Sequence, residues 1–490
     1  MEFNFPDFEF HIKGKRVLKE RKKAFYLSLI LPGLGQIYQR RFITGIFFLF
    51  TFSLPFYYLY LIGFKLNYGS ISLIVALIFL YILQAIDAKR GATRETSPCE
   101  DFCPANVNIP SFMSFSSVGK FKKAFGVFVS KAPFPLTLGE ICPATCETKC
   151  GILPGRSLKI REVHKEFGRL VLKEMKIIKR NPIFPVVNRK VAIIGGGPAG
   201  LSAAYYLASC GVKVDIFEKE KTLGGLLNLI PDFKLDKELL QREIEFITSF
   251  KNLRVFLKTN VNSKLSGYDF IVIAVGSQKE RKFDIPVEGK SAVVYPLSFL
   301  KFPPDLQGKK VAIVGAGDTA FDIARLVLRL GGKAFVFYRG SSENFRANPR
   351  EVNLAIREGV EVFTNCLPEV IKDNRITFSC GSISFDYLVP AIGFEKDKKI
   401  FETFEISGEK FFESNVFVVG DALNGMTTAI EAIKSGRVAA EKILKKLGLG
   451  DRIWFTVDFY EPKKESLKGD NLFIVSESSL CQHCGEKVKS

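Results

Sequence analysis

The strongest constraint on the fold is a glycine-rich turn between an apolar run and a small-residue helix, which this chain of 490 residues contains twice. The first copy, RKVAIIGGGPAGLSAAYYLASCGVKVDIFEKE, holds Gly195, Gly197 and Gly200 and ends its second apolar run at Glu218. In such a loop the first glycine permits a tight turn, the second lets backbone amides approach a pyrophosphate, and the third lets helix and strand pack closely. The pattern predicts a dinucleotide-binding fold in which Glu218 accepts hydrogen bonds from ribose hydroxyls. A glycine-rich turn that binds nothing is the alternative.

The second copy, GKKVAIVGAGDTAFDIARLVLRLGGKAFVFYRG, has Gly315, Gly317 and Ala320 at the same spacing, but its second strand ends at Tyr338 and Arg339 with no acid. An arginine in place of the carboxylate suits a ribose 2′-phosphate, so this site favours NADPH over NADH. Arg339 as a solvated surface charge is the alternative. One site with an acid and one with an arginine predict flavin and nicotinamide binding in the same chain.

Two later stretches, YDFIVIAVGS (residues 268–277) and NVFVVGDALNGMTTAIEAIKSGRVAAEKI (residues 415–443), resemble the segments that close the flavin domain of flavoproteins with two dinucleotide-binding domains. The resemblance implies that the flavin domain is split around the nicotinamide domain. It also implies that Gly420 and Asp421 lie against the ribityl and pyrophosphate groups of FAD, with the following helix aimed at the flavin ring. Asp421 as an ordinary turn residue is the alternative.

Two apolar runs near the N-terminus, residues 42–64 and 66–86, predict a transmembrane hairpin. Each reaches the roughly 20 residues that a helix needs to cross a bilayer. Basic residues crowd before the first run and after the second, which places both termini and the catalytic domains on the cytoplasmic side of the inner membrane. Residues 24–39 are too short and broken for a span, so we expect an interfacial or re-entrant segment there. The stretch PGLGQIYQRRFITG resembles a two-helix membrane module of bacteria, and a buried helical hairpin of a soluble protein is the alternative.

The net charge of +19 concentrates at residues 13–23 (KGKRVLKERKK), directly before the first apolar run. This position favours an anionic membrane surface over nucleic acid as the partner. The sequence contains no pattern of a zinc finger, an RNA-recognition domain or a basic zipper. We therefore expect a lipid bilayer, and no nucleic acid, among the partners.

Seven of the ten cysteines fall in short clusters, and the other three stand alone at Cys210, Cys366 and Cys380. Structural disulfides are rare in proteins that face the cytoplasm. The three isolated cysteines are therefore predicted to be ordinary core or surface thiols. The clustered ones are Cys99 and Cys103, then Cys142, Cys146 and Cys150, and finally Cys481 and Cys484 near the C-terminus.

The motifs SPCEDFCPANVNIP and GEICPATCETKC, followed by IPDFKLDKELLQREI after a Gly224-Gly225 pair, make the chain similar to a known family. From Ser97 to Leu447 it resembles the small subunit of NADPH-dependent glutamate synthase and the N-terminal half of dihydropyrimidine dehydrogenase. The resemblance implies a helical region with two 4Fe-4S clusters before the flavin domain, and it adds Gly225 to the residues that bind FAD. Thiolate ligands suit iron–sulfur cores.

The chain departs from the family pattern at its first cysteine pair, because Gly91 and Arg94 stand where two thiols are expected. We expect the terminal Cys481 and Cys484 to fold back and complete the cluster begun by Cys99 and Cys150. Half of a zinc site and a redox-active thiol pair are the alternatives for the terminal cysteines.

The second cluster would take Cys103, Cys142 and Cys146 and a fourth ligand from the following helix. Alignment with the family places His164 at that position, where a carboxylate or amide is usual. His164 as a plain helix residue is the alternative, and His483 is a spare candidate. Gly340 stands where the family often has a second arginine, which keeps NADH open as the nucleotide.

We therefore expect an α/β protein with two Rossmann-like dinucleotide-binding domains, preceded by a helical iron–sulfur domain and a transmembrane hairpin. The predicted order is a membrane anchor (1–95), a helical 4Fe-4S domain (96–185), an FAD domain in two parts (186–300 and 385–450), an NAD(P)H domain (301–384) and a tail (451–490).

The predicted function is an NAD(P)H oxidoreductase that carries FAD and two 4Fe-4S clusters. Hydride would pass between NAD(P)H and FAD, and single electrons would pass through the clusters to a partner protein. No catalytic side chain is expected, because the cofactors supply the chemistry. A flavin-dependent thiol–disulfide reductase that uses the terminal cysteines and a non-enzymatic scaffold are the alternatives.

Overall fold

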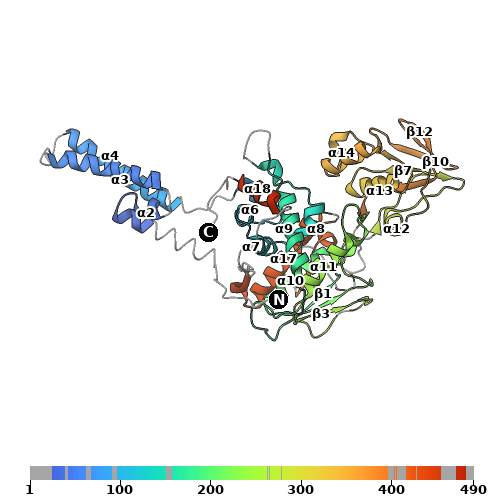
Figure 1. The fold of residues 1–490 in the computed structure, drawn as a ribbon, viewed down its shortest axis with the longest axis horizontal. Coiled ribbons are helices and arrows are strands. Elements are labelled where there is room, and N and C mark those ends of the chain that lie inside the picture. Colours follow the sequence, from blue (N-terminus) through green and yellow to red (C-terminus); the bar gives the residue numbers. More distant parts are fainter. Residues whose placement is uncertain are drawn as a thin grey trace.

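A computed structural model describes most of the chain. The described residues are 25–38, 42–61, 68–90, 97–150, 157–395 except 262, 264 and 278, then 402, 404, 415–425, 427–453 and 471–481. Figure 1 shows a helical pair, α3 (Phe42–Leu61) and α4 (Tyr68–Arg90), apart from a larger body of sheets and helices.

The first sheet has five parallel strands in the order β15-β4-β1-β2-β3. Its strands are apolar because helices cover the sheet, and Val191 to Ile194 of β1 are all buried. Strand β15 comes from far along the chain, so residues 415–425 close a sheet that begins near residue 190. The strands are β1 (Lys190–Ile194), β2 (Lys213–Phe217), β3 (Leu253–Phe256), β4 (Phe270–Ile273) and β15 (Val416–Val418), and the helices are α10 (Pro198–Ser209), α11 (Lys237–Thr248), α16 (Asp421–Asn424) and α17 (Ala429–Lys446), with 3-10 turns η2 (Gly225–Leu229) and η4 (Gly450–Ile453).

The second parallel sheet has the order β13-β7-β8-β9 and a second glycine-rich turn after β7. Its strands run to Pro390, past residue 384, where the sequence places the end of the NAD(P)H domain. Beside it lies a smaller sheet, β12-β11-β10-β6. The elements are β6 (Val287–Glu288), α12 (Pro296–Lys301), β7 (Lys310–Val314), α13 (Asp318–Arg329), β8 (Lys333–Phe337), η3 (Ser342–Asn344), α14 (Pro349–Glu358), β9 (Glu361–Phe363), β10 (Pro368–Lys372), β11 (Arg375–Phe378), β12 (Gly381–Ser384) and β13 (Tyr387–Pro390).

The two chain crossings between the sheets pair with each other. Strand β5 (Lys279–Glu280) leaves the first sheet and β14 (Phe394–Glu395) returns to it, and the two form an antiparallel pair. Each of the two parallel sheets has its own hydrophobic core. The pair of β5 and β14 forms the narrow neck that joins the two sheets.

A helical region precedes the first sheet and shares one continuous hydrophobic core with it. Tyr206 of α10 donates to the Val129 carbonyl of this region, and Phe125 packs edge to face on Phe246. The elements are α5 (Pro98–Asp101), α6 (Ile109–Ser117), α7 (Phe121–Val129), α8 (Pro135–Ile141), η1 (Glu147–Lys149) and α9 (Ile160–Glu174), joined by the C-terminal helix α18 (Asn471–Ser479).

The N-terminal helices correct one prediction. Within the described residues, none of the helices has the length and apolar character needed to span a bilayer. The predicted inner-membrane location, with the catalytic domains and both termini in the cytoplasm, is therefore wrong. Helix α3 covers Phe42–Leu61, and residues 62–64 of the predicted first span lie outside the described residues. Helix α4 (Tyr68–Arg90) includes Asp87, Lys89 and Arg90.

Hydrogen bonds also stabilise the interior of the unit formed by the N-terminal helices. The side-chain amide of Gln36 in α2 (Leu34–Tyr38) donates to the Gln84 carbonyl at 2.8 Å, and the Gln84 side-chain amide donates to the Ser28 carbonyl at 2.8 Å. The basic run at residues 13–23 lies outside the described residues.

A disulfide corrects a second prediction. Cys366 and Cys380, expected to be isolated thiols, form a disulfide with their Cα atoms 5.1 Å apart. The register explains the pairing: Pro368 of β10 faces Phe378 of β11, so two residues further out Cys366 faces Cys380. Cys210 is a buried free thiol, as expected.

Candidate functional site

The first glycine-rich turn leaves room for a ligand at one glycine and none at the other two. A Cβ on Gly195, whose φ is +103°, would lie 2.5 Å from the Ala274 carbonyl oxygen, and one on Gly200 would lie 2.0 Å from the Gly195 carbonyl oxygen. A Cβ on Gly197 would meet nothing within 4 Å. The space beside Gly197, at the N-terminus of α10, fits a pyrophosphate group.

Glu218 lies at the end of β2, directly against this turn. Its side chain is buried, one carboxylate oxygen accepts from the Gly196 amide at 2.7 Å, and the other accepts from the Glu220 amide at 2.9 Å. Each oxygen keeps a further acceptor site, so Glu218 can also accept from ribose hydroxyls.

Two segments distant in sequence converge on the same helix start. The Gly224 amide donates to the Gly196 carbonyl at 2.8 Å, and a Cβ on Gly225 would lie 3.1 Å from the Gly197 Cα. On the other side, a Cβ on Gly420 would lie 2.9 Å from the Ala199 Cβ. The structure thus brings Gly195, Gly197, Gly200, Glu218, Gly225 and Gly420 together around one end of α10.

Asp421 follows Gly420 and closes the loop before α17. Its Oδ1 accepts from both the amide and the hydroxyl of Thr427, at 2.9 and 2.7 Å. Burial raises the pKa of Asp421, against the hydrogen bonds from Thr427. Thr428 and Glu431 then cap the start of α17 with reciprocal hydrogen bonds.

The second turn repeats this geometry in the other sheet. A Cβ on Gly315, whose φ is +130°, would lie 2.1 Å from the Ala391 carbonyl oxygen, whereas one on Gly317 would meet nothing within 4 Å. Ala320 is fully buried, so it packs where the first turn has its third glycine. Arg339 is exposed at the end of β8.

The sequence interpretation missed one further cation beside this turn. The Arg346 amide donates to the Ala316 carbonyl at 3.1 Å, which anchors the exposed Arg346 next to the second glycine-rich turn. The separation of Arg346 from Arg339 by a 3-10 turn hid it from a motif search. Arg346 therefore places a second cation beside this turn, in addition to Arg339. Gly340 has no side chain that could supply one.

The cysteine loops carry backbone amides aimed at sulfur. Cys103 and Cys142 are each followed by Pro-Ala and a left-handed residue nearby, which is Asn106 (φ +54°) after the first alanine and Ala144 itself (φ +55°) in the second loop. Burial raises the pKa of Cys103, while backbone hydrogen bonds from Val107, Ala105 and Asn106 lower it. Hydrogen bonds from backbone amides to sulfur stabilise thiolate ligands and tune iron–sulfur clusters.

The thiols lie close enough to interact electrostatically. Cys142 interacts with Cys103, and Cys146 interacts with both of them and also with Cys99. Cys99 interacts in addition with Cys150. Burial raises the pKa of Cys142 to about 11, so a positively charged metal centre is needed to keep the thiolate form at neutral pH.

In the part of the chain that the structure describes, no three His, Cys, Asp or Glu side chains are placed to hold one metal ion. A 4Fe-4S cluster distributes its four ligands over four irons, whereas a zinc ion binds all of its ligands itself.

The C-terminal helix reaches the cysteine-rich region. Helix α18 packs on α6 and α9, as Figure 1 shows, and Glu477 accepts from the Lys159 amide at 2.9 Å. The Ser478 hydroxyl lies 3.9 Å from the Met113 sulfur. Cys481 is half-buried against the same core that Cys99, Cys146 and Cys150 contact. Cys484 and His483 lie outside the described residues.

His164 is placed differently from the thiols. Its Nδ1 lies 2.9 Å from the Pro135 carbonyl oxygen, and its ring packs 4.5 Å from the ring of Phe128. Burial lowers the pKa of His164 to about 4, so the imidazole is neutral at neutral pH. The contacts of His164 are those of a core residue of α9.

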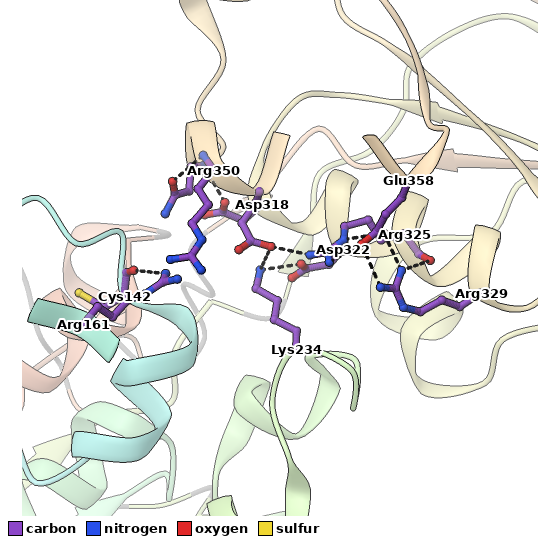
Figure 2. A network of polar contacts seen from close by, with 11 residues as sticks. Cys142, Arg161, Lys234, Asp318, Asp322, Arg325, Arg329, Arg350 and Glu358 are labelled. Atoms are coloured by element: carbon purple, nitrogen blue, oxygen red, sulfur yellow. Dashed lines mark hydrogen bonds and ion pairs between the residues drawn. The ribbon is translucent and has the colours of Figure 1, made fainter. Parts of the chain in front are cut away.

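Another residue of α9 reaches the cysteine loops instead. The buried Arg161 donates from Nη1 to the Cys142 carbonyl at 3.0 Å, as Figure 2 shows, and its amide donates to Glu147 at 2.8 Å. The sequence interpretation missed Arg161 because arginine is not an expected ligand and its partner lies on another helix.

Comparisons with known proteins agree with these two regions. Residues 189–436 match the profile of the pyridine nucleotide-disulphide oxidoreductases, and residues 81–174 match that of dihydropyrimidine dehydrogenase domain II, 4Fe-4S cluster. The matches confirm the predicted oxidoreductase class and the α/β fold with an iron–sulfur domain. The predicted membrane module finds no support among them.

Several curated relatives match most of the chain. It is 28% identical to the small chain of NADPH glutamate synthase from Escherichia coli, over 71% of this chain and 88% of that protein. It is 30% identical to the NADPH-Fe(3+) oxidoreductase subunit beta of Geobacter sulfurreducens, over 59% of this chain and 45% of that protein.

A third relative is the NADP(+)-dependent formate dehydrogenase subunit beta of Moorella thermoacetica, 29% identical over 72% of this chain and 60% of that protein. The chain thus spans about half the length of several relatives that it matches. The match over residues 189–436, which covers half of the sequence, shows that the chain belongs to the pyridine nucleotide-disulphide oxidoreductase family.

Proposed function

We propose that this protein transfers hydride between NAD(P)H and a bound FAD, and that two 4Fe-4S clusters relay single electrons between the FAD and a protein partner. The observation that carries the proposal is the position of the cysteine-rich helices: they share one hydrophobic core with the sheet that carries the first glycine-rich turn. A flavin at that turn and clusters at those thiols would lie in one rigid unit.

The FAD site would consist of the residues around the start of α10. Gly195, Gly197 and Gly200 would receive the pyrophosphate, Glu218 the ribose, and Gly225, Gly420 and Asp421 the remaining length of the cofactor. Bound flavin accepts an electron pair as hydride and exchanges single electrons with iron–sulfur centres. The protein residues bind, orient and shield it from water.

The nicotinamide nucleotide would bind at Gly315, Gly317 and Ala320, with Arg339 and Arg346 near the ribose. Two exposed cations beside the turn support NADPH over NADH. Replacing both arginines by alanine should raise the KM for NADPH by about tenfold or more and leave the KM for NADH nearly unchanged. Equal changes in KM for NADPH and NADH would contradict the preference of this site for NADPH.

For the clusters, Cys99, Cys150, Cys481 and Cys484 would hold one, and Cys103, Cys142 and Cys146 would hold three positions of the other. The docking of α18 beside α6 and α9 supports this role for the tail over that of a thiol pair that exchanges disulfides at the flavin. The fourth ligand of the second cluster was predicted to be His164, and its contacts with Pro135 and Phe128 give this assignment no support.

The names of several relatives describe subunits of larger oxidoreductases. They support a protein partner that receives or supplies the electrons. Affinity purification of the full-length chain under anaerobic conditions, followed by NADPH addition, tests the whole proposal. Bleaching of both flavin and iron–sulfur absorbance by NADPH is the expected result, and flavin bleaching without any iron–sulfur signal would overturn it.

A further inference from the structure

Two arginines from different domains face one carboxylate at the surface of the cysteine-rich region. Arg350, in the first turn of α14, donates from Nη1 to Glu162 of α9 at 2.8 Å. Arg161, the neighbour of Glu162 on α9, has its Nη2 4.0 Å from the same carboxylate oxygen. Glu162 thus lies between a cation of the nucleotide domain and a cation of the iron–sulfur region.

Arg161 is the buried member of this group. Its side chain is 6% exposed, and its Nη1 donates to the Cys142 carbonyl. Its Nε is fully buried and has no hydrogen-bond partner among the residues that the structure describes. A buried cation is costly unless negative charge lies near it, and Glu162 and Glu147 supply part of that charge to Arg161. A cluster with thiolate ligands at Cys103, Cys142 and Cys146 carries such a charge.

The nucleotide domain also meets the flavin domain through charged side chains. Lys234, in the loop before α11, contacts Asp322 of α13 at 2.6 Å and Glu351 of α14 at 3.6 Å, as part of the network in Figure 2. Phe233 packs under Arg325 and Arg329. Interfaces between domains of one chain are often polar and permit relative motion. On separation, water can hydrate the charged groups, while the Phe233 ring loses its contact with the two arginines.

We propose that Arg161 raises the reduction potential of the cluster held by Cys103, Cys142 and Cys146, and that docking of the nucleotide domain through Arg350 controls this effect. The inference rests on the proposed function. In the docked arrangement, Arg350 compensates Glu162, so the charge of Arg161 acts on the cluster. When the nucleotide domain moves away, Glu162 compensates Arg161, and the potential falls. The position of the nucleotide domain would thereby set how readily the cluster takes an electron.

The test is the reduction potential of the clusters in the full-length protein, measured by electron paramagnetic resonance at a series of applied potentials. Arg161→Gln should shift the reduction equilibrium of one cluster at least tenfold toward the oxidised form. This corresponds to a potential lower by about 59 mV for one electron. Arg161→Lys should restore most of that change because it keeps the charge. Arg169→Gln, on the same helix and paired with Glu166, is the matched control and should leave both potentials unchanged.

Two surface variants test the control by docking. Arg350→Ala should lower the same potential, because Glu162 is then free to compensate Arg161. In a Glu162→Gln background, Arg350→Ala should have no effect on the potential. This non-additivity separates the proposed coupling from a general loss of positive charge. It also keeps the test valid if Arg161→Gln fails to fold, because Arg350 is 50% exposed.

Unchanged potentials in both Arg161→Gln and Arg350→Ala would overturn the inference while leaving the proposed function intact. Equal effects of Arg350→Ala with and without Glu162 would overturn the coupling through that carboxylate. A parent protein without any iron–sulfur signal would instead overturn the proposed function itself. Iron content measured for each variant distinguishes these results.

Discussion

Gly197 and Gly200 lie three residues apart in one loop, yet they differ in their tolerance of a side chain. A methyl group on Gly197 would point into open space, whereas one on Gly200 would overlap the Gly195 carbonyl. We expect Gly197→Ala to fold as the parent does and to lose FAD affinity by tenfold or more, because the methyl occupies the space for the pyrophosphate. Flavin fluorescence titration of the apoprotein measures this.

Gly200→Ala is the comparison for that variant. Because the added methyl overlaps backbone, we expect a loss of about 1–3 kcal/mol or more in the free energy of unfolding. Thermal unfolding of both apoproteins separates the two effects. A Gly197→Ala protein that binds FAD as tightly as the parent would contradict the placement of the pyrophosphate.

Glu243 of α11 is a buried carboxyl group that holds the start of α8. It accepts from the Leu136 amide, the Thr137 amide and the Thr137 hydroxyl, at 2.6, 2.9 and 2.5 Å. Burial raises the pKa of Glu243 from 4.5 to about 7, against the hydrogen bonds from Thr137 and Leu136. The unfolded chain therefore releases this proton at lower pH than the folded chain does.

The sign of the pH effect follows from this difference. Below the unfolded pKa both states hold the proton, and between about pH 4.5 and about pH 7 only the folded state does. We expect Glu243 to make the folded state less stable as pH rises through this range, by at most about 3 kcal/mol. Urea unfolding of Glu243→Gln should show a smaller pH slope than the parent, and the exposed Glu238→Gln should show the parent slope. An identical slope in all three proteins would contradict this assignment.

At this scale, the sequence predicts the residues whose roles are local. The glycines of both turns and Glu218 can be found because strand, turn and helix follow one another within about 30 residues. Glu243 and Arg161 could not be found in this way. Glu243 binds an amide 106 residues away, and Arg161 contacts a carbonyl on another helix.

Among the helices, α18 bears most directly on which cysteines bind the clusters. It packs on α6 and α9 and brings Cys481 to the core that Cys99 and Cys150 contact. We expect replacement of Cys481 and Cys484 by serine to remove about half of the bound iron, because one of two clusters loses two ligands. Iron and sulfide analysis of anaerobically purified protein measures this.

Serine substitution leaves the helix in place, so it tests the thiols and not the packing of α18. Cys210→Ser is the matched control, because Cys210 is a buried free thiol in the flavin domain. It should retain the iron of the parent. Unchanged iron in the tail variant would contradict a role of the terminal cysteines as ligands.

Element pairing also explains the disulfide that the sequence did not predict. Cys366 and Cys380 face each other only because β10 and β11 pair in one particular register. Strand register depends on which side chains face the core and cannot be obtained from the spacing of two cysteines. The N-terminal helices show a similar limit, since apolar composition predicted spans that the described helices do not form.

At the scale of the whole molecule, Lys234 connects the flavin and nucleotide domains. Its side chain is 9% exposed and pairs with Asp322 and Glu351, which are 10% and 8% exposed. Replacing Lys234 by methionine leaves the buried Asp322 without this partner, while Glu351 keeps Arg325 at 2.7 Å. Removing one partner of a buried ion pair typically costs about 3–5 kcal/mol. We expect Lys234→Met to release the nucleotide domain, seen as faster proteolysis at the neck formed by β5 and β14 and a larger radius of gyration in solution.

Lys234→Arg should retain the parent behaviour because it keeps the charge. Lys309→Met is the control, since Lys309 pairs with Asp386 within the nucleotide domain and is 44% exposed. Parent-like proteolysis of Lys234→Met would show that other contacts hold the domains together.

The order of the domains could be predicted from the sequence because each glycine-rich turn marks its own sheet. The arrangement of the domains relative to one another could not be predicted, because it depends on ion pairs between residues that are far apart in the sequence. Lys234 and Asp322 are 88 residues apart, and Glu162 and Arg350 are 188 residues apart. No local pattern distinguishes these charges from solvated ones.

The most direct test of the proposed function is the cofactor content of the anaerobically purified, full-length protein. The expected result is about one FAD and about eight irons per chain, with electron paramagnetic resonance signals from two reduced clusters after dithionite addition. A yellow protein that contains flavin, lacks iron and gives no resonance signal would contradict the account.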